Sequence, residues 1–533
     1  MAILKTKIKR DGETFKGRKD KMMGLLEDLN IKLNICRDQG PEKYQTRHKD
    51  KGKMLARDRV ELLLDQGTEF LELMPMAGYE QKEMTNGASI IGGIGVVGGK
   101  KCVINANVPT IKGGALNYMS VLKSQRLDVI AKENRLPTIY LTESAGADLS
   151  QQSLVYNIGG ASFREISRRS AMGIPSITIV FGSSTAGGAY IPGMSDYVIM
   201  VNKNAKVFLA GPPLVKMATN EDTTDELLGG AQMHSRVSGV SDFLAENEQE
   251  AIELAKELVS QFLPQGSGNK NLQLEIKDPL FESEDLLGIV STDLKRQFDI
   301  KEVIARVVDG SEFLEFKPIY GPTLVTGYAK IMGHSVGILA NNGVLFSEAS
   351  NKGAQFIQLC NQENRPLIFL QNITGFMVGS KIEQGGIIKH GAKLINAVSN
   401  SQVPAITILV GASYGAGNYA MCGRAFEPRF LFAWPNSKLA VMGAEQLAGV
   451  LEIIKRESSA KAGIPINEDK IQDSRSKTIE QVQYESSAYY GSSRIWDDGI
   501  IDPRNTRKIL GECLSIINLN PVKSKRQYGV FRM

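Results

Sequence analysis

Histidine and cysteine are scarce in this sequence. The 533 residues include 4 histidines, at positions 48, 234, 334 and 390, and their spacing matches neither H-E-x-x-H nor any other paired metal motif. The 5 cysteines, at 36, 102, 360, 422 and 513, include no C-x-x-C pair. A zinc ribbon, an imidazole metal site and a disulfide framework are therefore not expected, and we predict no metal.

Long apolar runs are also missing. No stretch of about 18 apolar residues occurs, and the N-terminus has no apolar signal core, so we expect no membrane span. Asp11, Glu13 and Asp20 argue against a transit peptide. The expected compartment is the cytoplasm, or the mitochondrial matrix if the organism is a eukaryote.

Basic residues gather near the N-terminus, in KGRKDK (16–21) and TRHKDKGK (46–53). Because no aromatic residues are interleaved with them and no known DNA or RNA motif is present, nucleic acid is not an expected partner. Two interpretations stay open. The cations belong to a solvated helical arm, or some of them meet the phosphates of an anionic ligand.

The chain contains an internal repeat. NRLPTIYLTESAG (134–146) recurs as NRPLIFLQNITG (364–375), and MGIPSITIVFGSSTAGGAY (172–190) recurs as SQVPAITILVGASYGAGNY (401–419). From residue 137 to residue 190 the offset is a constant 229, so that Pro137 pairs with Pro366 and Gly182 with Gly411. Matches in several ordered blocks indicate two related domains in tandem.

Each copy alternates near-continuous apolar strands with helical segments. This pattern is typical of a parallel α/β core whose strands are covered on both faces. The polar segment FLPQGSGNKN (262–271) is a linker candidate. We predict an N-terminal helical arm at 1–45, a first domain at 46–275 and a second at 276–533.

Two motif matches are not supported by the residues around them. Gly93, Gly95 and Gly98 form G-x-G-x-x-G, but another strand-like segment follows where a dinucleotide site needs a helix, so we interpret them as part of a β-hairpin. LVKM (214–217) is similar to the tetrapeptide that carries biotin. It lacks the methionine before the lysine, and we interpret it as a coincidence.

A third match is G-x-S-x-G at residues 411–415, the turn that exposes a hydrolase's nucleophilic serine. No histidine follows Ser413, so the order of the α/β-hydrolases is impossible, although other known orders place histidine first. The equivalent turn of the first copy has Ser184 in place of Ser413, and two nucleophiles would need two bases. We favour an incidental serine.

Both copies share two small-residue turns that suggest a different use. A strand-end turn (144–147 and 373–376) is followed by a helix-start bend (186–188 and 415–417). One main-chain N–H from each turn can converge on a single oxygen, and the helix N-terminus adds a favourable dipole. Such a pair is an oxyanion hole made of backbone. Alternatively, the glycines only permit close packing of helix on strand.

The sequence as a whole resembles the β subunit (carboxyltransferase) of biotin-dependent acyl-CoA carboxylases, most closely the methylcrotonyl-CoA carboxylase type. The resemblance runs over nearly the whole chain, and its most specific motifs stand in order: FGSSTAGGAYIPGMSD (181–196), LAGPPLVKMAT (209–219), LGGAQMHSRVSGVSD (228–242), QNITGFMVG (371–379) and GASYGAGNYAMCGRAFEPRFLFAWPNSKLAVMGAEQ (411–446). It implies an α/β fold built as a tandem duplication of two crotonase-like (ClpP/crotonase superfamily) domains.

The resemblance also implies a mechanism in which carboxyl moves from carboxybiotin to an acyl-CoA through an enolate, held by two backbone oxyanion holes. The first copy would hold the acyl-CoA thioester, with Ala145, Gly146, Gly187 and Gly188. The second would hold carboxybiotin, with Gly375, Phe376, Gly415 and Ala416. For coenzyme A the matching segments offer Arg57, Arg59, Lys112, Gly113 and Gly114, whose cations would suit phosphates, although solvated or structural roles stay open.

The cofactor would be biotin carried by a partner subunit, since the chain has neither a biotin-lysine motif nor a nucleotide-binding loop. The implied partner is an α subunit with biotin carboxylase and biotin carboxyl carrier parts. Members of the family form homo-hexamers (dimers of trimers) in which each active site joins the N domain of one subunit to the C domain of another.

The acyl group stays open at this point. TGF (374–376) and YGAGNY (414–419) are closer to methylcrotonyl-type or geranyl-type subunits than to propionyl-type ones. However, Gln151-Gln152 stands where methylcrotonyl-type subunits usually have an Arg-Gln pair. Our first choice is 3-methylcrotonyl-CoA. The alternatives are propionyl-, acetyl- or geranyl-CoA carboxylase, the carboxyltransferase subunit of a sodium-pumping acyl-CoA decarboxylase, a crotonase-like hydrolase or hydratase, and a non-catalytic scaffold.

Overall fold

The computed structural model of the chain describes residues 12–262, 275–291, 296–463, 465–494, 496–519 and 529–531. It divides into two compact units. Unit 1 comprises residues 1–169, 174–231 and 244–260, and unit 2 comprises 170–173, 232–243 and 261–533. Most of the predicted linker lies outside the described residues, so the predicted division at 275/276 stays a prediction.

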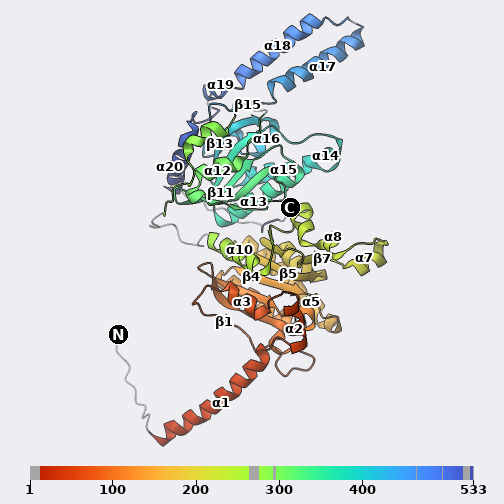
Figure 1. The fold of residues 1–533 in the computed structure, drawn as a ribbon, viewed down its shortest axis with the longest axis vertical. Coiled ribbons are helices and arrows are strands. Elements are labelled where there is room, and N and C mark those ends of the chain that lie inside the picture. Colours follow the sequence, from red (N-terminus) through yellow and green to blue (C-terminus); the bar gives the residue numbers. More distant parts are fainter. Residues whose placement is uncertain are drawn as a thin grey trace. The chain divides into compact units, whose positions relative to one another are not determined.

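Unit 1 is built on a mixed 8-stranded sheet with the strand order β1-β2-β3-β4-β5-β6-β8, with β7 paired to β5 (Figure 1). The strands β1 to β3 are antiparallel, and β3 to β6 are parallel. Their bounds are β1 Leu71–Glu72, β2 Ile90–Val97, β3 Lys100–Asn107, β4 Thr138–Ser144, β5 Ser176–Thr185, β6 Tyr197–Val201, β7 Lys206–Phe208 and β8 Phe243–Ala245.

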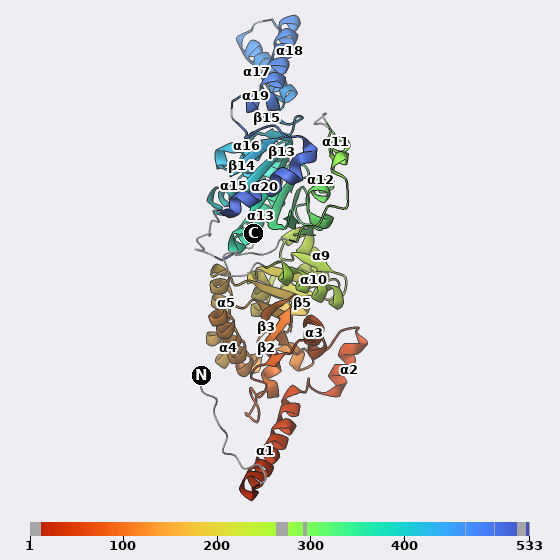
Figure 2. The ribbon, with the colours of Figure 1, turned by 90° about the vertical axis from the view of Figure 1, so that its left-hand side faces the viewer.

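Helices cover both faces of this sheet. In Figure 2, α4 and α5 lie on one side of the strands, and α3 and α10 lie on the other. All of β4 is buried, as its continuous apolar run predicts for a parallel strand covered on both faces. The helices of this unit include α1 Glu13–Arg37, α2 Glu42–Asp50, α3 Ala56–Leu63, α4 Tyr118–Asn134, α5 Gln152–Ala171, η4 Ala186–Ala189, α6 Tyr190–Met194, α7 Pro212–Thr219 and α10 Glu248–Gln261.

Unit 2 repeats the plan with a 7-stranded sheet in the order β14-β13-β12-β11-β10-β9, with β15 paired to β13. The antiparallel β10–β11 hairpin corresponds to β2–β3, and the parallel strands β12 and β13 correspond to β4 and β5. Their bounds are β9 Leu314–Glu315, β10 Leu324–Ile331, β11 His334–Asn341, β12 Leu367–Ile373, β13 Ala405–Tyr414, β14 Phe430–Ala433 and β15 Lys438–Ala440. The tandem duplication expected from the repeat is confirmed.

The helices of unit 2 follow the same scheme with one addition. The long helices α17 and α18 lie side by side and extend away from the body of the unit (Figures 1 and 2). The bounds are α12 Ile300–Val307, α13 Ser347–Glu363, α15 Ile387–Asn400, α16 Gly415–Ala420, α17 Ala444–Ala462, α18 Glu468–Glu485 and α20 Thr506–Leu519. Within the described part of the chain, no helix has both the length and the hydropathy that a membrane span requires.

Two motif interpretations are resolved by the fold. Gly93, Gly95 and Gly98 lie on β2 and in the turn that leads to β3, so the G-x-G-x-x-G match belongs to a β-hairpin and opens no helix. Lys216 of LVKM lies on α7, where its ammonium is 2.6 Å from Asp222. The segment is helical, which supports the coincidence.

Candidate functional site

The strand-end turn and the helix-start bend of unit 1 meet at the carboxyl edge of the sheet. β4 and β5 are parallel neighbours, and Ser144 stands opposite Ser184 after a shift of register. A Cβ placed on Gly146 would lie 3.2 Å from the carbonyl oxygen of Thr185, which shows how closely the two turns approach. The parallel pairing thus brings together the two small-residue turns that the internal repeat predicts.

Unit 2 has the same arrangement. Ile373 stands opposite Ser413 across β12 and β13, again after a shift of register. A Cβ on Gly417 would lie 3.3 Å from the Cα of Gly375, so the strand-end turn and the helix-start bend are in contact here too.

The strand-end turn of unit 1 engages most of its amides internally. The Ala145 N–H donates to Gly113 O (2.9 Å), and the Gly146 N–H donates to Ser144 Oγ (3.1 Å). The Asp148 N–H donates to Leu116 O (2.9 Å), while the Gly146 carbonyl accepts from the Leu116 N–H (2.8 Å). The amides of Ala145 and Gly146 are therefore used to hold the turn together.

The remaining amide of that turn belongs to Ala147, which is exposed. In unit 2 its counterpart is Phe376, which forms the same parallel bridge to Leu345 as Ala147 does to Leu116. Among the described residues neither amide has a hydrogen-bond acceptor. The structure therefore identifies Ala147 as a donor that was overlooked in the sequence, although the offset of 229 from Phe376 points to it.

The helix-start bends present a second amide in each unit. Gly187 is the second residue of η4 and Ala416 the second of α16, and amides at this place in a helix have no intrahelical acceptor. Both residues are exposed, whereas Gly188 and Gly417 are buried. The structural counterparts are thus Gly187 and Ala416, and Gly188 lies one position deeper.

Within the part of the chain that the structure describes, Ser413 has no contact that would activate it as a nucleophile. It is 1% exposed, its hydroxyl donates to Gln371 Oε1 (2.5 Å), and it accepts from the Asn418 amide (2.7 Å). Its counterpart Ser184 donates to the carbonyl of Gly188 (2.9 Å). Ser413 therefore links two side chains and Ser184 holds the backbone of the bend, in agreement with an incidental serine in G-x-S-x-G.

A cleft of about 470 Å³ adjoins the strand-end turn of unit 1. The Ala145 N–H is bonded to Gly113, which is one of the residues lining the cleft, and this bond joins the cleft to the turn. The cleft carries several basic side chains from α2 and from the β3–α4 connection. It is lined by Tyr44, Arg47, His48, Lys51, Pro109, Thr110, Lys112 and Gly113.

Of the residues expected to bind coenzyme A, Lys112 and Gly113 lie in this cleft. Lys112 is more than half exposed and is 2.9 Å from Asp148 at its ammonium. Gly114 lies behind the cleft, where a Cβ would collide with the carbonyl oxygen of Glu143. Gly114 therefore serves close backbone packing.

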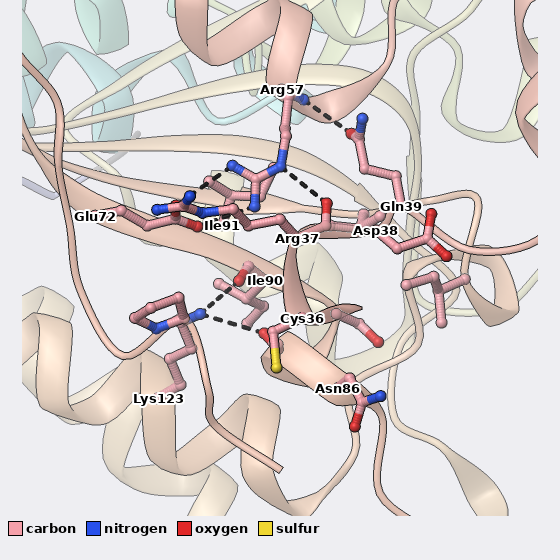
Figure 3. A pocket seen from close by; sticks show the side chains of 15 residues that line it. Cys36, Arg37, Asp38, Gln39, Arg57, Glu72, Asn86, Ile90, Ile91 and Lys123 are labelled. Atoms are coloured by element: carbon pink, nitrogen blue, oxygen red, sulfur yellow. Dashed lines mark hydrogen bonds and ion pairs between the residues drawn. The ribbon is translucent and has the colours of Figure 1, made fainter. Parts of the chain in front are cut away.

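Arg57 and Arg59 are engaged elsewhere. Figure 3 shows the Arg57 guanidinium turned toward Glu72 and the Arg37 carbonyl; it lies 3.0 Å from Glu72 Oε1 and donates to Arg37 O at 3.0 Å. Arg59 is 1% exposed and pairs with Glu143 (2.9 Å) and Glu248 (2.6 Å). These contacts support a structural role for both arginines rather than binding of coenzyme A.

Gln151, where the sequence departs from the methylcrotonyl-type pattern, also has a structural role. It is buried, its Oε1 accepts from the Tyr118 N–H (2.9 Å), and its Nε2 donates to Glu83 O (2.9 Å). Gln152 is exposed at the start of α5. The Gln-Gln pair therefore fixes the start of α4 through its first member.

No group of three or more histidine, cysteine, aspartate or glutamate side chains within the described ranges is arranged to hold a metal ion. Burial lowers the pKa of His334 and of His390, which belong to different parts of unit 2. The convergent groups at the two turns are main-chain amides.

Comparisons with known proteins address the family and the fold. Residues 47–531 match the family model described as the carboxyl transferase domain. A relative from Mycobacterium tuberculosis, named as a probable biotin-dependent acyl-coenzyme A carboxylase beta2 subunit, is 52% identical over 96% of both chains. The mitochondrial methylcrotonoyl-CoA carboxylase beta chain of Arabidopsis thaliana is 47% identical, covering 100% of this chain and 92% of its own.

A solved structure shows the same architecture. The transcarboxylase 12S crystal structure, described as a hexamer assembly with methylmalonyl-coenzyme A and methylmalonic acid bound, superposes with a TM-score of 0.83. It is 31% identical in sequence and covers 93% of this chain and 96% of its own.

Proposed function

Since the chain belongs to the carboxyl transferase domain family, as the β subunit of a biotin-dependent acyl-CoA carboxylase, we propose that it carboxylates 3-methylcrotonyl-CoA through two backbone oxyanion holes. Unit 1 would hold the acyl-CoA and unit 2 the carboxybiotin of a partner subunit. The observation that supports this most directly is the repetition of the same pair of exposed amides in both units.

In unit 1 the amides of Ala147 and Gly187 would donate to the thioester oxygen of the acyl-CoA. They stabilise the negative charge that develops there as the acyl group loses a proton to form the enolate. Gly146 supports the turn, and Gly188 supports the bend. The N-terminal dipole of the following helical segment favours the same charge.

In unit 2 the amides of Phe376 and Ala416 would donate to the ureido oxygen of biotin, which gains negative charge when the carboxyl group leaves. Gly375 and Gly415 give these amides their direction. Bound biotin would supply the carboxyl group and an acceptor for the proton that the acyl-CoA gives up, while Phe376 and Ala416 hold its ureido oxygen. The chain itself contributes the amides that stabilise negative charge on the thioester oxygen and on the ureido oxygen.

The cleft beside the strand-end turn would receive coenzyme A. Arg47, Lys51 and Lys112 offer positive charge for its phosphates, and Gly113 connects the cleft to the turn. A thioester in the oxyanion hole would extend its coenzyme A into this cleft.

Two observations favour 3-methylcrotonyl-CoA among the acyl groups. Relatives named for this substrate are 46–47% identical over the whole chain. In addition, Phe163 and Tyr190 form an aromatic pair with centroids 5.8 Å apart, and a Cβ on Gly187 would lie 3.8 Å from the Phe163 ring. An aromatic wall at the hole suits a flat, conjugated acyl group.

The proposed assembly is a homo-hexamer with a biotin-carrying α subunit, in the cytoplasm or in a mitochondrial matrix. The test is to co-purify the chain with its biotinylated partner and to measure kcat/KM for 3-methylcrotonyl-, propionyl-, acetyl- and geranyl-CoA. We expect the highest value for 3-methylcrotonyl-CoA, and a higher value for another acyl group would refute the choice. The isolated chain should transfer carboxyl from carboxybiotin but show no ATP-dependent carboxylation.

A further inference from the structure

Glu143 is a buried carboxylate in contact with both strands that carry the turns of unit 1. It is the penultimate residue of β4, two positions before Ala145. Its side chain lies against Gly182 of β5, where a Cβ would collide with the carboxylate, and its carbonyl oxygen lies against Gly114. Any movement of Glu143 is therefore transmitted to the strand-end turn.

Three basic side chains surround this carboxylate. Lys53 Nζ is 2.5 Å from Oε1, Arg59 Nη1 is 2.9 Å from Oε2, and His48 Nε2 is 3.9 Å from Oε2. Burial alone would raise the pKa of Glu143, but Arg59 and Lys53 outweigh it and hold the pKa below its usual value. Burial lowers the pKa of His48, so the charges acting on Glu143 near neutral pH are those of Lys53 and Arg59.

Arg59 is itself held firmly. It pairs with Glu248 of α10 at 2.6 Å, and its guanidinium lies 4.2 Å above the ring of Phe181, which precedes Gly182 on β5. Loss of Lys53 alone would therefore leave the carboxylate with one partner and the packing of Arg59 intact. Substitution of Lys53 therefore tests the role of Glu143 with little disturbance of the surrounding packing.

The cations come from a short segment, residues 48–59, which runs from the end of α2 into α3. The same α2 lines the cleft with Tyr44, Arg47 and His48, and Lys51 follows it directly. One segment thus contacts both the cleft and, through Glu143, the strand-end turn. It is therefore a second connection between the two, beside the bond between the Ala145 N–H and Gly113 O.

Unit 2 has no charge at the equivalent position. Asn372 lies against Gly411 as Glu143 lies against Gly182, and its Oδ1 accepts from the Ala412 N–H at 3.2 Å. A neutral side chain is thus sufficient to support the turn there. The carboxylate and its cations thus occur in unit 1, the unit that contains the cleft.

We propose that Glu143 is a positioning residue of the acyl-CoA site: through Lys53 and Arg59 it ties the strand-end turn to the segment that forms the coenzyme A cleft. Coenzyme A in the cleft and the amide of Ala147 at the thioester are thereby held at a fixed separation. This inference rests on the proposed function and names the residue that aligns its first site.

The test compares two neighbouring lysines in the holoenzyme. Lys53→Met removes a partner of Glu143, and the matched Lys51→Met removes a cation of the cleft that has no bond to Glu143. For Lys53→Met we expect kcat for acyl-CoA carboxylation to fall by about 10- to 100-fold, because misplacement of the turn acts on the chemical step. The dissociation constant of free coenzyme A, measured by calorimetry, should stay near that of the wild type.

Lys51→Met should show the reverse, with the dissociation constant of coenzyme A raised by about two- to fivefold, as for one exposed ion pair, and kcat retained. If Lys51→Met leaves coenzyme A binding unchanged, the proposed cleft is wrong, whatever Lys53→Met does. If Lys53→Met raises the dissociation constant and keeps kcat, Lys53 is a ligand of coenzyme A and the positioning role is overturned.

A merely structural role is separated by the partial reaction in unit 2. Decarboxylation of the carboxylated carrier without acyl-CoA should be unchanged in Lys53→Met and in Glu143→Gln, which keeps the shape of the side chain and removes its charge. A parallel loss of this reaction and of thermal stability in Lys53→Met would overturn the proposal. If Glu143→Gln does not fold, Lys53→Met decides alone.

Discussion

Ala186 and Gly415, 229 residues apart in the chain, have the same left-handed backbone conformation, with φ of 52° and 54°. Each is the first residue of a helix-start bend and precedes the exposed amide of its unit. An L-residue with a side chain rarely adopts this conformation, and such strain concentrates at functional sites. Glycine would adopt this conformation with less strain than Ala186 does. That the strain is present at Ala186 suggests that the direction of the following amide, that of Gly187, is important.

The strain predicts opposite effects of two substitutions. Gly415→Ala should lower the stability of the chain by about 1–2 kcal/mol, the cost of a left-handed non-glycine residue. Its Cβ would also lie 3.0 Å from Val441 O. Ala186→Gly should be neutral or stabilising by up to about 1 kcal/mol, because the lost side chain is exposed. Thermal unfolding of both variants measures this, and a destabilised Ala186→Gly would show that the bend is not strained.

Acyl selectivity is expected to depend on the aromatic ring beside Gly187. Phe163→Ala opens space next to the proposed thioester position, so kcat/KM for 3-methylcrotonyl-CoA should fall about tenfold or more relative to geranyl-CoA. Gln152→Ala, an exposed change at the start of the same helix, is the control and should leave the ratio unchanged. An unaltered ratio in Phe163→Ala would place the acyl group elsewhere.

A buried lysine in unit 2 predicts a pH dependence of stability. Lys352 is 0% exposed and donates to Lys317 O at 3.0 Å, and burial lowers its pKa to about 7. The unfolded chain, with a lysine pKa of about 10.4, binds more protons between these values, so this residue makes stability rise with pH from about 7 to about 10.

Lys352→Met should remove this contribution, which is at most about 1.4 kcal/mol per pH unit. Urea unfolding at pH 7, 8 and 9 compares the slopes of the two proteins. Lys330→Met, a change of an exposed lysine on β10, should keep the slope of the wild type. Equal slopes in Lys352→Met and the wild type would mean that the lysine does not titrate in this range.

The repeat in the sequence predicted the two turns and their partnership, since the offset of 229 holds from the first buried strand to the bend. It did not predict which amides face outward. Gly146 has a φ of 90°, so the chain has already turned there, and a step of one residue separates its bonded amide from that of the exposed Ala147. Only the bridges from Leu116 and Leu345 show which amide of each turn is engaged.

The charged residues were harder to assign from the sequence. Arg59 resembled a phosphate ligand because its segment is basic, but its partners Glu143 and Glu248 are distant in the chain. Nothing in the local pattern shows that a guanidinium will be buried against carboxylates that arrive from other elements. Lys112 and Gly113, in contrast, lie on a loop between β3 and α4, where exposure is the ordinary expectation.

The central claim is that each unit holds a different oxyanion with one pair of amides. It is tested most directly by Gly187→Val and Ala416→Val, measured in two partial reactions: hydrogen exchange of the acyl-CoA and decarboxylation of the carboxylated carrier. Both positions are exposed, and the backbone of Gly187 suits a side chain. Gly187→Val should lose about 10²–10³-fold in the first reaction only. Ala416→Val should lose a similar factor in the second reaction and should also slow the first, because the ureido group held there is the proton acceptor. A loss of decarboxylation in Gly187→Val, or normal rates in both reactions for either variant, would contradict the account.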